Sequence, residues 1–482
     1  MDNEENRSPQ PLTPQAFRYQ VAGYARDILS YGVIRSHVIT LMIDDAKVIF
    51  VYYDHSLIVE SEVLDLQDSE QKLLFVKMIK QMHALSPEAL GIIPNLQAPF
   101  MYDPKQLKNP GLYLEPAAKE GTIPSHKVLV GCLLTVDYNT KTRQGQRTVR
   151  LGKVLFCSNG INGRGTKVIR VTCSCKDGDC AWKGKDGECD WKGLKLRCTD
   201  MAVDEHAWVL KHLPNVLGWF ITDGGALQVR LKLMFGADYD ERLICGSIQE
   251  ELCPIMDLES QEQFAQVMYD VLQCHEWVYT HPRVLHRDIS QANIMFRRDA
   301  TKKIYGVLND YDLAALVDER HAPTSGHRTG TKPYMAHEQQ RTGWTGPLFY
   351  RHDLESLFYV ILLLVYHYQR PGVKAEKLEF VKWFTEGDDF IYKEKSNLLR
   401  VVDFSWIAAP QPFFGAFRYW LQTIRDSLVD GFSDQGLALR KARVGGQISF
   451  DLETLGDNFS YKTMSAVMRN FDGKELVTRN PK

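Results

Sequence analysis

The sequence predicts an α+β protein in which a strand-rich segment comes before a helical one. Apolar strands follow one another from Val128 through Val149 to Phe156. In the second half of the chain, the run from Ser356 to Tyr368 is apolar nearly all round, and a helix of this kind must be buried. The run is shorter than the ~20 residues that a membrane-spanning helix needs. It therefore predicts the centre of a helical core.

Length and composition are those of a globular protein with room for two or three domains. Of the 482 residues, 44% are hydrophobic and 24% are charged, so the chain can bury a core. The formal net charge of −2 gives no sign of a surface for nucleic acid, and no such partner is expected. Because no apolar stretch follows residues 1–5, neither a secretory signal nor a membrane partner is expected. The ten cysteines are then expected to be reduced, and the location to be intracellular, cytoplasmic or nuclear. The oligomeric state is not predicted.

Changes in composition and pattern along the chain predict six segments. They are a disordered tail (1–14), an N-terminal α+β domain (15–93), a proline-rich linker (94–127), a strand-rich lobe (128–252), a helical lobe (253–475) and a short tail (476–482). In the N-terminal domain, apolar residues at helical spacing over 17–28 and 73–82 flank two strands, 38–43 and 48–53. No convergent catalytic group is visible there, so a scaffolding or regulatory role is expected ahead of an independent activity.

The stretch from Val284 to Phe296 carries the chemistry. Inside this apolar run, Asp288 is followed five positions later by Asn293, which is the form of a protein-kinase catalytic loop. Phosphoryl transfer needs a carboxylate that orients the acceptor hydroxyl and takes its proton, and Asp288 is the candidate. It also needs an oxygen ligand for a magnesium ion, and Asn293 is the candidate. Arg287, between His286 and Asp288, completes the His-Arg-Asp string.

A short hairpin after this loop predicts a second oxygen ligand. Residues 293–296 and 303–308 are predicted to be strands around the polar turn 297–302. A hairpin brings the chain back to its starting end, so Asp310 should lie beside Asn293. The carboxylate and amide oxygens would then converge on one magnesium ion.

These motifs resemble those of the fungal-type protein kinase family. The resemblance rests on His286–Ser290, Asn309–Ala314, Gly330–Glu338 and Tyr350–Ser356, with further similarity at Tyr52–Asp54 and Leu452–Gly456. It implies a bilobal protein kinase-like fold in which the strand-rich lobe is the N-lobe and the helical lobe is the C-lobe. It also implies ATP and Mg²⁺ as cofactors, and transfer of the γ-phosphoryl group to a serine or threonine hydroxyl of a protein substrate. Asp310 would then be the principal metal ligand, in the place of the aspartate of Asp-Phe-Gly.

Three positions depart from the general kinase pattern. Ser290 stands where serine/threonine kinases usually have a lysine near the transferred phosphate, Asp312 replaces the glycine of Asp-Phe-Gly, and His337 replaces the proline of Ala-Pro-Glu. The first two leave a catalytically weak pseudokinase scaffold open as an alternative. The other alternative is a small-molecule kinase of the aminoglycoside or choline type. Those enzymes lack the Gly-Thr…Met-Ala-x-Glu segment and the helix-opening aspartate that follow here, so the protein kinase is preferred.

The nucleotide-binding residues are less clearly marked. The glycine-rich loop 158–168 lies between two strands and could cover the ATP phosphates, with Gly163 and Gly165 near the phosphate oxygens and Val168 next to them. Its glycine spacing does not fit Gly-x-Gly-x-x-Gly-x-Val, so an ordinary hairpin loop is an equal alternative.

A kinase also needs a strand lysine that holds the phosphates and pairs with a helix glutamate. Lys195 is the candidate for the lysine, with Arg197 and Lys192 as rivals. In the helix predicted over 201–213, Glu205 is the candidate partner, and a solvated helix acid is nearly as good an interpretation of this residue.

The insertion 173–193, between the loop and the lysine, holds four cysteines: Cys173, Cys175, Cys180 and Cys189. Four thiolates could bind tetrahedral zinc and so order a loop that cannot bury a core of its own. The usual paired Cys-x-x-Cys spacing is absent, so free thiols are the expectation.

The polar stretch 317–335 predicts an activation segment. A phosphate on one of its hydroxyls, Thr324, Ser325 or Thr329, could pair with Arg287, and an unmodified loop is the alternative.

Three residues around this segment have expected structural roles. Thr331 stands where serine/threonine kinases hold a threonine near the catalytic aspartate, which favours alcohol over phenol acceptors. Glu338 is expected to be buried in a salt bridge with an arginine that the sequence does not identify. Asp353, which opens the apolar helix, is expected to brace the backbone of the catalytic loop.

Overall fold

The computed structural model describes residues 14–32, 34–97, 129–139, 144–157, 167–173, 204–222, 225–236, 239, 244–317, 330–400, 409–443 and 450–480. The chain divides into two compact units. The first holds residues 1–190 and 216–249, and the second holds residues 191–215 and 250–482. Among the described residues, no helix is long and apolar enough to cross a membrane.

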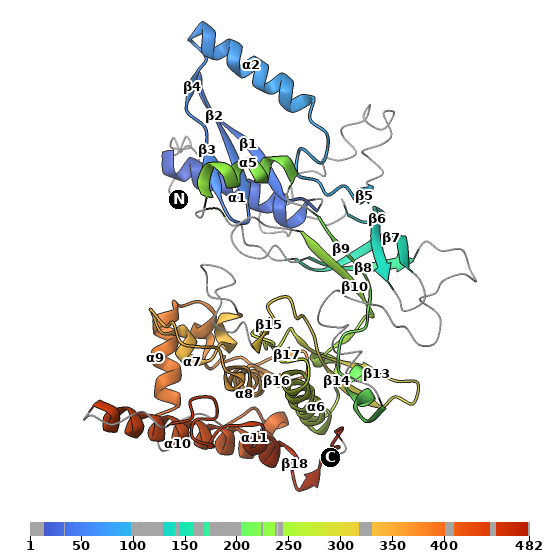
Figure 1. Cartoon of the computed structure of the whole chain (residues 1–482), viewed down its shortest axis with the longest axis vertical. Helices are drawn as coiled ribbons and strands as arrows, with labels where there is room; N and C mark the ends of the chain where they lie inside the picture. The colour runs from blue at the N-terminus through green and yellow to red at the C-terminus, as the bar shows by residue number, and fades with distance from the viewer. Residues whose placement is uncertain are drawn as a thin grey trace, which may run out of the picture. The chain divides into compact units, whose positions relative to one another are not determined.

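The first unit begins with a helix packed on a small antiparallel sheet (Figure 1). Helix α1 (Pro14–Tyr31) is followed by β1 (His37–Asp44), β2 (Lys47–Asp54), β3 (Ile58–Glu60) and β4 (Leu64–Asp65), and β2 pairs with each of the other three strands. The predicted helix and hairpin are confirmed, and Asp45 makes the turn with a φ of 52°. The core of this part consists of Val21, Ala25 and Leu29 from α1 and Val38, Met42, Val51 and Tyr53 from the sheet.

Helix α2 (Ser69–His83) forms where the apolar spacing predicts it, but none of its residues is buried. Leu73, Leu74 and Val76 are exposed. The start of the helix is fixed by Asp68, whose carboxylate accepts hydrogen bonds from the second and third helical N–H groups at 2.8 and 3.0 Å. Local signals therefore set this helix, and packing contributes little to it.

A helix from much later in the chain completes the small sheet. Leu231 of α5 (Gly225–Phe235) is buried together with Tyr52 and Tyr239. At the end of β2, Asp54 is fully buried, and its carboxylate accepts the hydroxyl protons of Tyr52 and Tyr239 at 2.8 and 3.0 Å. Two backbone N–H groups also donate to it, each at 2.7 Å. The segment 15–93 thus packs on residues outside it, and its boundary as a separate domain stays a prediction.

The rest of the first unit is a six-stranded antiparallel sheet. Its strands are β5 (Leu96–Gln97), β6 (Leu133–Asn139), β7 (Gln144–Cys157), β8 (Lys167–Cys173), β9 (Val216–Ile221) and β10 (Cys245–Gln249), in the order β10-β9-β6-β7-β8 with β5 on β6. The strands predicted through Val149 to Phe156 are confirmed. The start predicted at Val128 is wrong, because residues 129–131 make a turn in which Gly131 has a φ of 88°, and the strand begins at Leu133.

The second unit is mainly helical, with several short strands paired between its helices (Figure 1). In chain order its elements are η4 (Asp204–Lys211), β11 (Cys253–Pro254), η6 (Ile255–Asp257), α6 (Gln261–Thr280), β12 (Val284–Leu285), β13 (Ile294–Arg298), β14 (Ile304–Leu308), β15 (Ala315–Leu316), η8 (Lys332–Tyr334), α7 (His337–Gln340), α8 (Tyr350–His367), β16 (Tyr368–Arg370), β17 (Val373–Lys374), η9 (Val381–Phe384), α9 (Asp388–Leu398), η11 (Pro412–Phe417), α10 (Arg418–Arg443), α11 (Tyr461–Met468), β18 (Asn470–Phe471) and β19 (Lys474–Glu475).

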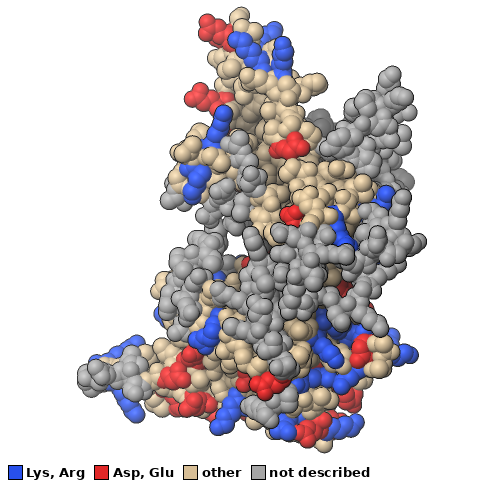
Figure 2. All heavy atoms as spheres, turned by 45° about the vertical axis from the view of Figure 1, so that its right-hand side comes forward, with Lys and Arg blue, Asp and Glu red and all other residues tan. Residues whose placement is uncertain are grey.

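Helix α8 is the centre of the second unit. Every one of its residues is buried, as its apolar sequence predicts. Helix α6 packs on it and on the hairpin β13–β14, and α10 covers α8 from another side. On the face drawn in Figure 2, basic and acidic side chains are interspersed over the surface of this unit.

Hairpin strand β14 lies so close to α6 that only glycine fits at residue 306. A Cβ atom there would lie 2.6 Å from the carbonyl oxygen of Val267, a backbone atom that cannot turn aside. Gly306→Ala is therefore expected to lower the free energy of unfolding by about 1–3 kcal/mol, measured by urea denaturation. Gly436 of α10 has no atom within 4 Å of such a Cβ, so Gly436→Ala is the control and should stabilise by about 0.5–1 kcal/mol. Equal effects at the two glycines would contradict the close-packing argument.

Candidate active site

The predicted catalytic loop lies between β12 and β13, and its acid is held by a threonine from the predicted activation segment. Asp288 is buried, and its Oδ1 accepts hydrogen bonds from the N–H and the Oγ1 hydroxyl of Thr331 at 2.8 and 2.7 Å. The side-chain amide of Asn293 donates to the Asp288 carbonyl oxygen at 2.8 Å. The structure thus brings together three residues that the sequence singled out.

The hairpin returns the chain to Asn293 as expected. Ile294 pairs with Leu308, and the N–H of Asn309 donates to the carbonyl oxygen of Asn293 at 2.8 Å. Asp310 follows directly, with a φ of 62°. A positive φ is unfavourable for a residue other than glycine, and such residues cluster at functional sites.

His286 ties the catalytic loop to the end of the hairpin. Its Nδ1 accepts the N–H of Asp288 at 3.3 Å, so Nε2 carries the proton and donates to the Asn309 carbonyl oxygen at 2.9 Å. Burial lowers the pKa of this imidazole, which keeps it in the neutral form that this pair of bonds requires. The ring also packs on that of Tyr311, with centroids 4.7 Å apart.

The expected brace from the apolar helix is present. Asp353 of α8 accepts the N–H groups of His286 and Arg287, both at 2.9 Å. Arg287 has a φ of 69°, so the brace holds a strained part of the loop in place. The second acceptor position on Oδ2 is filled by the imidazole of His275, 2.9 Å away.

Comparison with known proteins gives this arrangement a family. The model of a family described as fungal protein kinase matches residues 4–187 and 237–365, which is more than half of the chain. The chain belongs to the fungal protein kinase family. The match ends inside α8, so the similarity at Leu452–Gly456 stays a prediction.

Individual relatives are distant and cover little of the chain. A probable LRR receptor-like serine/threonine-protein kinase of Arabidopsis thaliana is 29% identical over 92 residues, 19% of this chain and 14% of the relative. A probable L-type lectin-domain containing receptor kinase of the same plant is 36% identical over 69 residues, 14% of this chain and 9% of the relative. The chain thus spans a small part of these relatives. The solved structure of vaccinia related kinase 3 covers 70% of this chain and 90% of its own, at 12% identity and a TM-score of 0.36, too low to add to the family assignment.

The arginine partner of Glu338, which the sequence did not identify, is Arg351 of α8. Its Nη2 donates to Glu338 Oε2, and His352 Nε2 lies 3.3 Å from the same oxygen. Burial alone would raise the pKa of Glu338, but the hydrogen bond from His352 and the charge of Arg351 outweigh it, and the pKa is lowered. The expected salt bridge is confirmed, but the side chain of Glu338 is partly exposed rather than fully buried.

The departure at His337 also has a structural reason. Its backbone N–H and its Nδ1 lie 2.7 and 3.1 Å from Oε1 of Glu355, a fully buried carboxylate of α8. Burial raises the pKa of Glu355, but the charge and hydrogen bonds of His337 outweigh it and set the pKa at about 2. Proline, which other kinases carry here, has no N–H to donate.

Several predicted nucleotide and regulatory residues lie outside the described residues. They are Gly163, Gly165, Lys195 with its rivals Lys192 and Arg197, the hydroxyls Thr324, Ser325 and Thr329, and the cysteines Cys175, Cys180 and Cys189. Val168 lies in β8 and is 45% exposed. Glu205 lies in η4, a 3-10 helix where the spacing predicts an α-helix, and its exposed carboxylate is 3.7 Å from His206 Nε2. Its pairing with Lys195 stays a prediction.

His275 and Lys395 are among the buried polar residues of the second unit that sequence reasoning missed. His275 sits on the apolar stripe of α6, three positions after Leu272, and a polar residue on such a stripe is the signal that could have found it. Lys395 of α9 donates to the Met335 carbonyl oxygen at 2.6 Å, and its Nζ lies 4.1 Å from the centre of the Tyr359 ring. Burial lowers the pKa of Lys395 well below its ordinary value.

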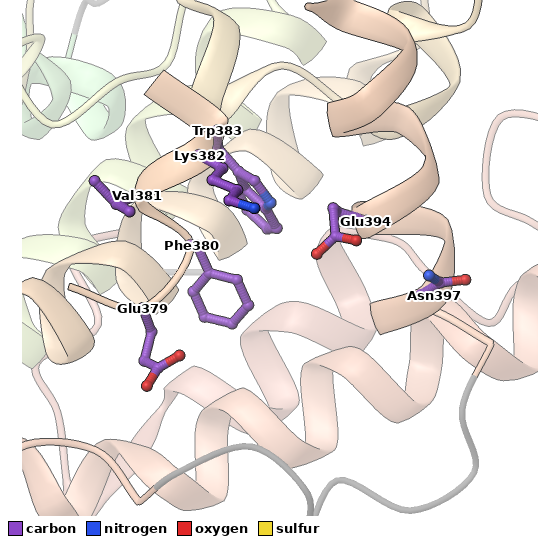
Figure 3. A pocket seen from close by; sticks show the side chains of 7 residues that line it. All are labelled: Glu379, Phe380, Val381, Lys382, Trp383, Glu394 and Asn397. Atoms are coloured by element: carbon purple, nitrogen blue, oxygen red, sulfur yellow. The ribbon is translucent and has the colours of Figure 1, made fainter. Parts of the chain in front are cut away.

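The residues that the structure describes hold no metal cluster, and a cavity among them lies away from the catalytic loop. Among the described residues, no group of three His, Cys, Asp or Glu side chains could hold a metal ion. A cavity of ≈ 390 Å³ lies at η9 and α9 (Figure 3). Its walls are Glu379, Phe380, Val381, Lys382, Trp383, Glu394 and Asn397. None of these belongs to the catalytic loop or the hairpin.

Replacing His337 tests the buried contact with Glu355. His337→Pro removes both donors and leaves the carboxylate buried, so the free energy of unfolding should fall by about 3–5 kcal/mol in urea denaturation. His337→Ala keeps the backbone donor and should lose less, about 1.5–3 kcal/mol. Tyr359→Phe removes a hydroxyl that donates to the same oxygen at 2.7 Å, and should lose about 1 kcal/mol. A His337→Pro protein as stable as the wild type would rule out this role.

Stability should fall on mild acidification because several histidines are buried. Burial lowers the pKa of His37, His212, His286, His352 and His367. Below the unfolded-state pKa of ~6.5 the unfolded chain binds protons that the native chain does not, so the native state loses stability. The lowered pKa of Glu355 affects stability only at lower pH. Its contribution to the stability of the native state is lost as the pH falls from the ordinary glutamate pKa toward about 2. The urea midpoint should therefore be lower at pH 5.5 than at pH 7.5. A midpoint that stays constant or rises on acidification would contradict this account.

Proposed function

We propose that this protein is an ATP- and Mg²⁺-dependent protein serine/threonine kinase that transfers the γ-phosphoryl group to a hydroxyl of a protein substrate. The observation that carries the proposal is the arrangement around Asp288. Its buried carboxylate receives two hydrogen bonds from Thr331, and Asn293 binds its backbone from the other side. Membership of the fungal protein kinase family supports the same reaction.

Asp288 would act on the acceptor hydroxyl. Oδ1 accepts two hydrogen bonds from Thr331, and Oδ2 accepts a longer one of 3.4 Å from the Asn293 amide, so Oδ2 would orient the substrate hydroxyl and accept its proton during transfer. Its position is fixed by neighbours that are themselves fixed, since His286 accepts the Asp288 N–H and Asp353 holds the residues before it. Such preorganisation keeps the carboxylate ready for the reaction without rearrangement.

Asn293 and Asp310 would hold the magnesium ion. The amide nitrogen of Asn293 is committed to the Asp288 carbonyl oxygen, which leaves the amide oxygen for a cation. The Asp310 carboxylate accepts one long bond of 3.4 Å, from the N–H of Asp312. One amide oxygen and one carboxylate suit Mg²⁺, which takes few protein ligands together with phosphate oxygens. Magnesium, when bound with ATP, neutralises charge that develops on the transferred group.

The remaining nucleotide contacts are proposed from the sequence. Lys195 would hold the phosphates and pair with Glu205, and Gly163, Gly165 and Val168 would belong to the loop that covers them. Arg287 would form an ion pair with a phosphate on the activation segment. Thr331, bonded to the catalytic acid, favours serine and threonine over tyrosine as acceptors.

A catalytically weak pseudokinase is the second candidate. Ser290 offers no positive charge near the transferred phosphate, and the exposed Asp312 adds a negative one beside Asp310. Both features would slow phosphoryl transfer, because catalysis of this reaction is mostly electrostatic stabilisation.

Two substitutions test the proposed reaction. Asp288→Ala removes the base and Asp310→Ala removes a metal ligand, and each should lower transfer by a factor on the order of 10²–10⁴ or more while the thermal midpoint stays near that of the wild type. The assay follows radiolabelled phosphate from ATP onto peptide libraries, with small alcohols in parallel. Asp430→Ala, an exposed acid of α10, is the control and should keep full activity.

Each other result points to a different conclusion. Unchanged activity of Asp310→Ala would remove the metal assignment. Labelling of small alcohols alone would favour a small-molecule kinase. A wild-type protein that binds ATP with Mg²⁺ or Mn²⁺ and transfers nothing would favour the pseudokinase.

A further inference from the structure

Three buried side chains connect the C-terminal helix to the catalytic loop. The hydroxyl of Tyr461, the first residue of α11, lies 2.7 Å from Nδ1 of His275 in α6. Nε2 of the same imidazole lies 2.9 Å from Oδ2 of Asp353 in α8. That carboxylate accepts the N–H groups of His286 and Arg287. A continuous chain of hydrogen bonds therefore runs from α11 to the residues before Asp288.

Each bond in this chain has a defined direction. Burial raises the pKa of Asp353, but the hydrogen bond and charge of His275 outweigh it, so the pKa is lowered and the carboxylate only accepts. Nε2 of His275 must then carry a proton. In the neutral imidazole Nδ1 accepts, and Tyr461 donates its hydroxyl proton, which burial keeps in place by raising the pKa of the phenol. The hydroxyl of Tyr461 thus selects the imidazole tautomer that serves Asp353.

The position of Tyr461 is itself fixed from several sides. Ser460 caps α11 and so places the helix start, with its side chain accepting the N–H of Thr463. The ring of Tyr461 stacks on that of Tyr350 in α8, with centroids 4.4 Å apart and planes 9° from parallel. Next to it, Tyr279 of α6 donates to Glu453 at 2.6 Å. The segment 450–468 therefore contacts α6 and α8 through specific polar and aromatic groups.

We propose that His275 and Tyr461 are positioning residues of the catalytic loop, so that the C-terminal segment 450–468 is part of the catalytic apparatus. The proposal rests on the kinase function proposed above. The residues matched by the family model end at 365, so family membership does not assign this role to α11. Arg287 needs a firm brace because its φ is 69°, and Asp353 can hold its N–H only while the carboxylate itself is held.

Removing the hydroxyl of Tyr461 should loosen the brace without unfolding the protein. Nδ1 of His275 would then be buried without a donor, and the imidazole would no longer be restricted to one tautomer. The N–H groups of His286 and Arg287 would be held less tightly, and Asp288 would spend less time in its reactive position. The rate of the chemical step depends on that position, whereas ATP affinity does not.

The kinetic test uses the full-length chain. Tyr461→Phe should lower kcat about tenfold and leave the KM for ATP within about twofold. His275→Gln keeps an N–H donor for Asp353 and should lose less than His275→Leu, which keeps none and should lose about a hundredfold. Tyr366→Phe is the matched control, because Tyr366 is also buried and its hydroxyl has no hydrogen-bond partner among the described residues. If Tyr461→Phe and His275→Leu lowered kcat no more than the control, the proposal would be overturned.

Hydrogen exchange tests the coupling without any need for activity. The peptide spanning 284–290 should exchange about tenfold faster in Tyr461→Phe than in the wild type or in Tyr366→Phe, whereas peptides from α10 should not change. Faster exchange everywhere would mean a general loss of stability and would overturn the positioning role. If the wild type transfers no phosphate, the kinase proposal fails, but this exchange pattern still decides whether α11 holds the catalytic loop.

Discussion

The carboxylate of Asp353 is buried in the middle of the second unit and binds three donors that come from two other parts of the chain. A buried carboxylate without partners would be strongly unfavourable, so the fold has to place these donors around Asp353. Two of them are backbone N–H groups at the strained start of the catalytic loop, and the third is His275. The position of the loop is therefore set by a charge on α8, a helix whose residues are all buried.

The other hydrogen bonds of the site extend from this point. The backbone N–H of His286 donates to Asp353. One ring nitrogen of His286 accepts the N–H of Asp288, and the other donates to the carbonyl oxygen of Asn309. The neutral ring is needed for both bonds, and burial favours that form. The catalytic loop and the end of the hairpin are thus joined through one side chain. Loops carry the chemistry here, but buried elements fix their position.

Local pattern predicted the parts of this site that are close in sequence. The loop, the hairpin that returns to Asn293 and the buried helix all follow from spacing and periodicity over a few residues. The arginine that pairs with Glu338 and the histidine that pairs with Asp353 did not follow from it, although the bonds from Asp353 to the loop backbone were expected. Arg351 lies on an apolar helix where a charge is unexpected, and Tyr461 is 186 positions from His275. Such pairs are set by how helices pack, which a short-range pattern does not contain.

A buried carboxylate also needs donors in the first unit, and this need bears on the segment 15–93, which is predicted as a separate domain. Asp54 is fully buried and collects two backbone N–H groups and the hydroxyls of Tyr52 and Tyr239, so its burial depends on a residue 185 positions away. Without residue 239 the carboxylate would lose one donor and part of its cover. Both Asp54 and Tyr239 lie within the residues matched by the family model, whereas α5, between them, lies in the gap of that match. The small sheet therefore depends on a residue outside the segment 15–93, and whether that segment is a separate domain stays a prediction.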